Sequence, residues 1–294
     1  MSNRLSTWVY ATRPHTLGAS IAPMLVVLGA LIAEGVFDFL PYLCALLVAL
    51  SAQITSNFAN DYFDYKGEKD TDKRVGFRRV LVTGEVTPQE MLTAMLISTG
   101  ITILSGLAAV LLTGAWWLIA VGLLVLVGVY AYSYGPYPLS THGLGDVAVV
   151  LFYGMTPILA TYGAIGGTPP LYLLLMSVGI GIWEDNILVC NNYRDYAEDR
   201  ESGKQTIIVR MGEHFGPTMY LLNSLLTVIL LAIGIRLATE SWGQTAIVLS
   251  IAPLVAVLTA CIYRWHGSEL NKLLKYTNIV SLVIGLLLLI LQVL

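Results

Sequence analysis

Long apolar stretches separated by short polar joints run through almost the whole chain. Nine of them are close to the length of about 20 residues that a helix needs to cross a bilayer. They cover roughly residues 16–35, 41–61, 88–113, 115–133, 146–165, 170–194, 216–238, 243–264 and 274–294. None alternates apolar and polar residues with the period of two that membrane β-strands show. We therefore predict an all-α polytopic membrane protein, a single nine-helix bundle domain over residues 1–294 with cytosolic loops at 62–87 and 195–215.

Composition excludes the soluble alternatives. Apolar residues make up 56% of the chain and charged residues 12%, against roughly 45–50% and about 25% in ordinary globular domains. Residues 91–145 and 147–183 contain no Asp, Glu, Lys or Arg. The net charge of −3 argues against a nucleic-acid partner. The three cysteines are isolated within apolar stretches, so the sequence predicts neither a disulfide scaffold nor a thiol metal site.

The basic residues predict the orientation of the bundle. If the N-terminus is cytosolic and nine helices cross the membrane, fifteen of the 16 Lys and Arg residues lie on the cytosolic side. Only Arg236 lies outside. Cytosolic loops of membrane proteins are enriched in Lys and Arg, so we predict a cytosolic N-terminus and an external C-terminus.

The acidic residues cluster in two segments, each directly after a predicted membrane helix. Each segment carries three oxygen-bearing side chains spaced four residues apart, a spacing that places them on one face of a helix. The two triplets are Asn60, Asp64 and Glu68, and Asn191, Asp195 and Asp199. Stacked carboxylates repel each other, so stability alone does not favour this spacing. Hard oxygen ligands of this kind suit Mg²⁺, which binds one or two carboxylates together with waters and phosphate oxygens.

Basic residues are interleaved with these acids. They are Lys66, Lys69, Arg194, Arg200 and Lys204. Carboxylates together with Lys and Arg are typical of a polyphosphate bound through a bridging metal. An even number of predicted crossings separates the two segments, so both lie on the same side of the membrane. The pattern predicts a diphosphate site at the cytosolic face, for a substrate with a charged head and an apolar tail.

The two acidic motifs resemble the paired aspartate motifs of the UbiA superfamily, intramembrane prenyltransferases with nine helices. Three further segments are similar to the branch that prenylates 1,4-dihydroxy-2-naphthoate in menaquinone synthesis. They are Ala11–Thr16, Tyr134–Leu139 with Gly143–Asp146, and Asn191–Asp195 with Gly203–Thr206. The resemblance covers about residues 7–212. Glu68 stands where the superfamily usually has Asp, and Asp70 and Asp72 are alternative third ligands. Phe77 stands where the branch has Pro.

The resemblance implies an enzyme of the bacterial inner membrane. It implies Mg²⁺-dependent transfer (with Mn²⁺ as a substitute) of a polyprenyl group from polyprenyl diphosphate to 1,4-dihydroxy-2-naphthoate. The carboxylate leaves as CO₂, the product is demethylmenaquinone, and no protein partner is implied. The implied catalytic residues are Asp61, Asp64, Asp195 and Asp199. The implied metal ligands are Asn60, Asp61, Asp64 and Glu68 for one ion, and Asn191, Asp195 and Asp199 for the other.

Other residues are implied to bind the substrates. Candidates for the diphosphate are Arg13, Lys66, Arg194 and Lys204. Candidates for the acceptor or for the allylic cation are Arg78, Arg79, Tyr130, Tyr132, Tyr134, Tyr137 and Asp146. Glu184 and Asp185 lie at membrane depth, where a charge is costly, so we expect them to face the bundle interior. Glu184 is either a carboxylate supporting the metal ligands or a protonated structural acid.

Three alternatives remain open from the sequence. A secondary transporter would carry its charges near the membrane midplane on broken helices, whereas these clusters are at helix ends. A membrane phosphatase acting on prenyl diphosphates would need no aromatic acceptor. Within the superfamily, the acceptor could instead be 4-hydroxybenzoate, homogentisate or haem.

Overall fold

The computed structural model describes residues 4–67 and 75–294, and every regular element in these ranges is a helix. The longer helices are α2 (Gly18–Ala33), α3 (Phe39–Lys66), α4 (Pro88–Thr113), α5 (Leu118–Ala131), α8 (Leu171–Arg194), α11 (Phe215–Thr239) and α14 (Leu270–Val293). Two further rods are segmented: α6 (Gly145–Val149), η3 (Val150–Met155) and α7 (Thr156–Ile165), and α12 (Trp242–Leu249) with α13 (Ala252–Ile262). The short elements are α1 (Arg4–Ala11), η1 (Pro14–Thr16), η2 (Leu139–Thr141), α9 (Tyr196–Glu201), α10 (Ile207–Met211) and η4 (Gly267–Glu269).

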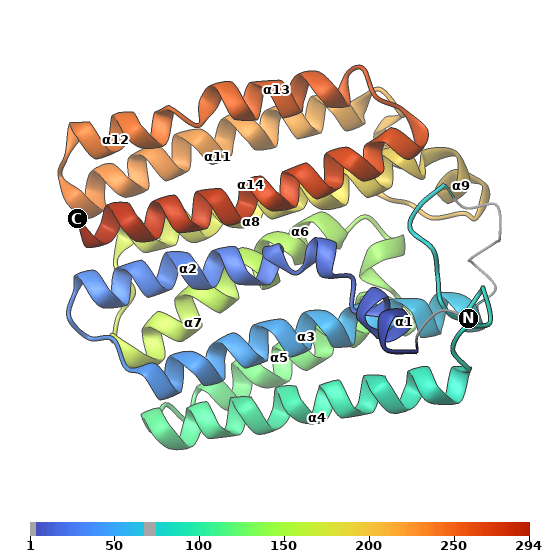
Figure 1. The fold of residues 1–294 in the computed structure, drawn as a ribbon, viewed down its shortest axis with the longest axis horizontal. Helices are drawn as coiled ribbons and strands as arrows, with labels where there is room; N and C mark the ends of the chain where they lie inside the picture. The colour runs from blue at the N-terminus through green and yellow to red at the C-terminus, as the bar shows by residue number, and fades with distance from the viewer. Residues whose placement is uncertain (1–3, 68–74) are drawn as a thin grey trace.

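The helices confirm an all-α, multi-pass membrane protein. Within the described ranges, seven helices are long and apolar enough to cross a membrane. An eighth span results if the pair Arg4–Thr16 and Gly18–Ala33, bent by 55°, counts as one. Helix α5 has 14 residues and falls below this length, so the predicted count of nine is not reproduced by the length criterion. Helix α1 and the C-terminus lie at opposite ends of the bundle (Figure 1).

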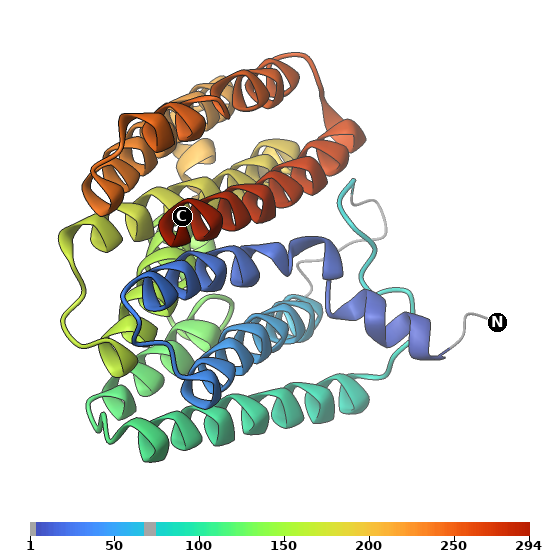
Figure 2. The ribbon, with the colours of Figure 1, turned by 60° about the vertical axis from the view of Figure 1, so that its left-hand side comes forward.

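The helices lie side by side in a flattened bundle, with α3 against α4, α8 against α11, and α2 against α14 (Figures 1 and 2). Between membrane helices, small residues allow close backbone contact. Gly154 of η3 faces Gly181 of α8 so closely that a Cβ on Gly154 would lie 2.4 Å from the carbonyl oxygen of Ser177. Element η3 is a π-helical turn, a local irregularity often found at functional sites. This contact fixes the rod of residues 145–165 against α8.

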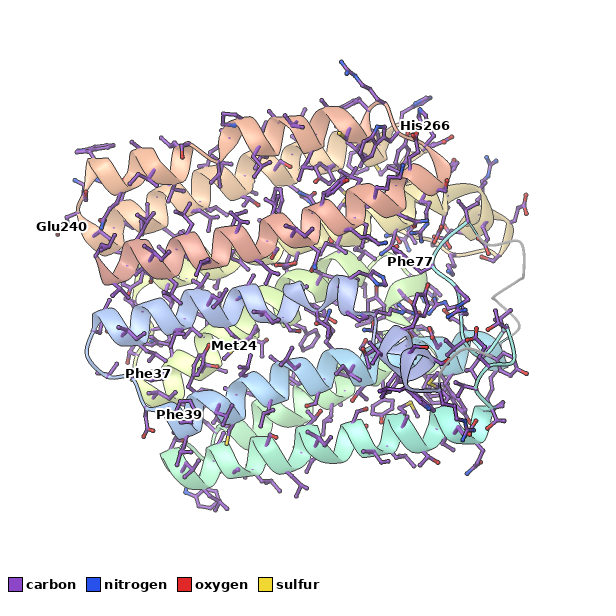
Figure 3. The ribbon with its side chains drawn as sticks, in the orientation of Figure 1. Met24, Phe37, Phe39, Phe77, Glu240 and His266 are labelled. Carbon is purple, nitrogen blue, oxygen red and sulfur yellow. The ribbon has the colours of Figure 1, made fainter. Side chains whose placement is uncertain are left out.

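The two acidic motifs lie at the same end of the bundle. Figure 3 places Phe77 and His266 at one end and Phe37, Phe39 and Glu240 at the other. Helices α3 and α8 both finish at the Phe77 end, which therefore carries both acidic motifs.

Candidate active site

A cavity of about 340 Å³ opens between the helices below the charged end of the bundle. Its polar lining comes from both acidic motifs and from separate basic residues: Arg13, Asn60, Asp64, Arg79, Asn191, Asp195, Asp199 and Lys204. The rest of the lining is largely apolar and includes Val125, Gly128, Val129, Phe152 and Pro157. The two motifs, which are more than 120 residues apart in the sequence, therefore share one cavity with a charged end and an apolar body.

The first motif occupies the last turns of α3 and is held by two arginines. Arg13 and Arg79 both donate to Oδ1 of Asp61, which is 3% exposed. Arg79 also approaches Oδ2 of Asp64, at 3.6 Å. Arg13 donates to Oδ1 of Asn60 at 3.2 Å. Asp61 does not line the cavity, so here it anchors arginines that do.

Arg13 reaches this position through an uncommon backbone conformation. Its φ of 54° and ψ of 63° place it in the left-handed region, which non-glycine residues adopt at a cost of order 1–3 kcal/mol. Such conformations persist where the surroundings fix them and cluster at functional sites. The ion pair with Asp61 provides such a constraint.

The second motif ends α8 and continues into α9. The guanidinium of Arg194 donates to both carboxylate oxygens of Asp195, each at 2.7 Å, and to Oδ1 of Asn271 at 2.6 Å. Lys204 pairs with Asp199 at 2.8 Å. The Arg194 side chain is 1% exposed and does not line the cavity, so it holds Asp195 in place. Lys204 does line the cavity.

Residues 75–79 connect the two motifs. Asn271, the partner of Arg194, also donates to the carbonyl oxygen of Val75 at 3.2 Å. The ring of Phe77 packs against that of His15 at a tilt of 35°, with ring centroids 4.0 Å apart, and lies 5.9 Å from the Arg194 guanidinium. Two residues later, Arg79 reaches the first motif. Sequence reasoning missed this connection, because its contacts join residues about 60 to 200 positions apart.

Several predicted site residues lie elsewhere. Lys66 lies over the Tyr62 ring, Arg78 over the Tyr10 ring and 3.0 Å from Glu85, and neither lines the cavity. Among the four predicted tyrosines, Tyr132 lines the cavity. The others contact neighbours: the Tyr130 hydroxyl bonds to that of Thr99, and the rings of Tyr134 and Tyr137 stack on Phe63 and His142. Glu68, Asp70 and Asp72 lie outside the described residues.

Three acids lie deeper in the bundle. Asp146 and Glu184 line the cavity. Glu184, 2% exposed, accepts a hydrogen bond from Ser281. Asp185, 3% exposed, accepts one from Asn223 at 2.9 Å. All three are therefore enclosed within the bundle rather than facing lipid.

The donor set of the cavity fits a hard divalent cation. The oxygen-bearing side chains of the two motifs that line the cavity, and are therefore candidate ligands, are Asn60, Asp64, Asn191, Asp195 and Asp199. In the described part of the chain, no three His, Cys, Asp or Glu side chains converge as a ready-made metal cluster. This agrees with Mg²⁺, which keeps several waters and shares phosphate oxygens rather than using an all-protein cage.

Comparison with known proteins gives the family. Residues 20–290 match the UbiA prenyltransferase family. The chain belongs to this family. Curated relatives include the 1,4-dihydroxy-2-naphthoate octaprenyltransferase of Haemophilus influenzae, 29% identical over 98% of this chain and 96% of the relative. The enzyme of the same name from Mycobacterium tuberculosis is 33% identical over 94% and 93% of the two chains.

A solved structure shares the fold. A UbiA homologue from Archaeoglobus fulgidus, bound to DMAPP and Mg²⁺, superposes with a TM-score of 0.70 at 18% identity. The match covers 97% of this chain and 99% of the homologue. The helical rods and their order are therefore those of UbiA prenyltransferases.

Proposed function

We propose that the protein transfers a polyprenyl group from polyprenyl diphosphate to 1,4-dihydroxy-2-naphthoate with loss of CO₂, giving demethylmenaquinone. The observation that carries this proposal is that one cavity is lined at its charged end by both acidic motifs, Arg13 and Lys204, and elsewhere by apolar side chains. Such a cavity matches a substrate with a diphosphate head and a hydrocarbon tail. The choice of acceptor is supported by the naphthoate prenyltransferases among the relatives.

The metal ligands proposed are the oxygens that line the cavity. Asn60 and Asp64 would serve one Mg²⁺, and Asn191, Asp195 and Asp199 the other, with Mn²⁺ as a substitute. Asp61 and Glu68 were included in the predicted first set; Asp61 lies beneath it, bound to Arg13 and Arg79. When bound, Mg²⁺ supplies Lewis-acid neutralisation of the charge that develops on the leaving diphosphate.

The chain's own cations hold the diphosphate beside these ligands. Arg13, Arg79 and Lys204 line the cavity, and each is paired with a motif carboxylate. Guanidinium groups offer several donors and can contact a carboxylate and a phosphate oxygen together. The sequence offered Arg79 as a candidate for the acceptor carboxylate; its contacts with Asp61 and Asp64 support a role in binding the diphosphate.

The apolar body protects the reaction from water. Departure of diphosphate leaves an allylic cation that water would convert to the alcohol. Val125, Val129 and Phe152 line the cavity next to Tyr132 and exclude water from this region. The Tyr132 and Phe152 rings also offer π faces, which attract cations.

The orientation proposed for the bundle places this site at the cytosolic face. Both acidic motifs and nearly all Lys and Arg residues lie at the same end by the positive-inside pattern. The membrane is then the bacterial cytoplasmic membrane, as the bacterial relatives suggest. The N-terminus is cytosolic and the C-terminus external.

One assay tests the function directly. Protein reconstituted in nanodiscs is supplied with Mg²⁺, one polyprenyl diphosphate and either 1,4-dihydroxy-2-naphthoate or 4-hydroxybenzoate, and the products are identified by mass. We expect a naphthalenediol that carries the prenyl group and has lost CO₂. A product that keeps its carboxylate, or equal turnover of both acids, would contradict the acceptor assignment while leaving prenyl transfer intact.

A further inference from the structure

Two aspartates on different helices meet beneath the charged end of the cavity. Asp146 lies in the first turn of the rod 145–165, and Asp185 lies in the middle of α8. They are 6% and 3% exposed. Asp185 precedes Asp195 by ten residues, which is about 15 Å along a helix. The pair therefore lies deeper in the bundle than the residues assigned to metal and diphosphate.

The two carboxyl groups lie within hydrogen-bonding reach of each other. Oδ1 of Asp146 and Oδ1 of Asp185 are both buried, and neither has a donor among the residues that the structure describes. The two side chains are hydrogen-bonded to each other. Two ionised carboxylates are both acceptors, so this bond requires a proton on one of them. The pair then carries one proton and one negative charge.

Asp185 is the member that keeps the proton. Its Oδ2 accepts the hydrogen bond from Asn223 at 2.9 Å, which leaves Oδ1 to carry the proton toward Asp146. The Asp146 carboxylate accepts a hydrogen bond from its own backbone N–H, in the first turn of a long helix where the dipole favours negative charge. Asp146 lines the cavity, whereas Asp185 does not. The negative charge therefore lies on the cavity side.

Packing alone does not account for this pair. A charge buried within a membrane bundle is costly, and such residues are rare and usually functional. Replacement of a buried polar pair by apolar residues of similar volume is often neutral or stabilising. An ionised carboxylate kept beside an apolar cavity is the arrangement expected of a proton acceptor.

We propose that Asp146 accepts a proton from a ring hydroxyl of the aromatic acceptor, and that Asp185 positions and maintains Asp146 for this role. The inference rests on the proposed function. The hydroxyl O–H bond breaks and the proton binds the second carboxylate oxygen of Asp146. The electron pair stays on the ring oxygen and enriches the ring carbon. That carbon bonds to C1 of the allylic cation, which forms when the C1–O bond breaks and the diphosphate leaves with that bond's electron pair. The bond between this carbon and its carboxylate then breaks, CO₂ leaves, and the electron pair of that bond restores the aromatic ring. The proton returns from Asp146 to the ring oxygen.

The two aspartates differ in their expected response to amidation. In Asp185→Asn, the amide N–H replaces the carboxyl O–H toward Asp146 and the carbonyl oxygen still accepts from Asn223. We expect transfer within about threefold of wild type, because one hydrogen bond replaces another. Asp146→Asn removes the proton acceptor and should lower kcat by about 10²-fold or more, the usual contribution of a general base. The kcat of Asp185→Ala should lie between those of Asp185→Asn and Asp146→Asn.

The measurement also separates chemistry from folding. For each variant we would follow prenylated product and prenyl alcohol in the same reaction, together with thermal unfolding. Loss of the proton acceptor leaves the metal and diphosphate residues intact, so the allylic cation still forms. Because the ring captures it more slowly, water converts more of it to the alcohol. The ratio of prenyl alcohol to prenylated product should therefore rise in Asp146→Asn and Asp185→Ala. Ser224→Ala is the matched control: Ser224 follows Asn223 on α11, bonds to Asn186, and does not line the cavity. Its activity and product ratio should match wild type.

Each other outcome overturns the inference. An equal decrease in kcat in Asp146→Asn and Asp185→Asn would show that the two aspartates have the same, purely structural role. Activity in Asp146→Asn above about a tenth of wild type would exclude a general base. If wild type prenylates a different aromatic acid, the same comparison is made with that acid, so failure of the naphthoate assignment is distinguished from failure of the pair. Absence of any prenyl transfer by wild type would overturn both.

Discussion

Substitutions of Asp195, a proposed metal ligand, can separate the effect of losing its negative charge from the effect of destabilising the fold. Asp195→Asn keeps the side-chain shape and one carbonyl oxygen for Arg194, but it removes the negative charge that faces the cavity. Loss of one electrostatic contact to developing charge typically costs 10²–10³-fold in kcat. We expect a decrease of about this size in both Asp195→Asn and Asp195→Ala.

The two substitutions should differ in stability. Arg194 is 1% exposed and makes two bonds of 2.7 Å to Asp195. Alanine removes both bonds, and Asn271 then remains as the hydrogen-bond partner of the buried guanidinium among the described residues. Breaking a buried pair costs about 3–5 kcal/mol. Asparagine keeps one acceptor, so its cost should be about 1–2 kcal/mol.

The assay is single-turnover prenyl transfer in nanodiscs, with thermal unfolding of the same samples. Asp38→Asn is the control. Asp38 caps the opposite end of α3 by accepting from the backbone N–H of Leu40, and asparagine caps a helix equally well. It should change neither activity nor stability. More than about a tenth of the activity in Asp195→Asn, or an Asp195→Ala protein as stable as Asp195→Asn, would refute the reasoning.

Three further outcomes are expected. Chelation should abolish transfer, and Mg²⁺ or Mn²⁺ should restore it better than Ca²⁺, because the cavity offers hard oxygens to a small octahedral ion; full activity after exhaustive chelation would contradict the metal site. 1,4-Dihydroxy-2-naphthoate should be preferred to 4-hydroxybenzoate by about 10²-fold in kcat/KM, since apolar contact differences are worth only a few kcal/mol. Gly181→Ala should destabilise the bundle by about 1–3 kcal/mol, because its Cβ would lie 2.7 Å from the carbonyl oxygen of Val150. Gly122→Ala has open space at the Cβ position and should be neutral by the same thermal measurement.

Local signals in the sequence account for much of the fold. Helix α4 begins after a capping box, in which Thr87 accepts from the backbone N–H of Glu90 and the Glu90 side chain accepts from that of Thr87. It ends at Gly114, whose φ of 68° suits glycine. The oxygen triplets are equally local, because a spacing of four residues alone places side chains on one helix face. Features of this kind can be read from short windows of sequence.

Breaks within apolar stretches are harder to predict. The stretch 243–264 forms two helices, α12 and α13, with Pro253 in the first turn of the second. Proline cannot donate to the preceding turn, yet hydropathy does not register this. Likewise, the stretch 115–133 gives a helix of 14 residues, because residues 116 and 117 form a turn before it and the helix ends at Ala131. Hydropathy measures where the chain meets lipid and not where its backbone bends.

The tyrosine series shows a different limit. Tyr130, Tyr132, Tyr134 and Tyr137 were grouped because they are close in sequence. Helix α5 ends at Ala131, so the following residues turn away from the helix axis and point in different directions. Tyr132 enters the cavity lining, whereas Tyr134 and Tyr137 are 59% and 54% exposed. Proximity in sequence predicts a shared site only while one regular element continues.

The basic partners of the acidic motifs could not be assigned from spacing, because they come from different parts of the chain. Arg13 precedes the first membrane helix, Arg79 follows the first motif, and Lys204 follows α9. Each pairs with a motif carboxylate. The repulsion between stacked carboxylates, which made the triplets unusual in the sequence, is therefore offset by cations that only the folded bundle brings to them. The same pairs keep three cations at the edge of the cavity beside the acidic oxygens, so the contacts that stabilise this end of the bundle also assemble the charges that a metal-bound diphosphate requires.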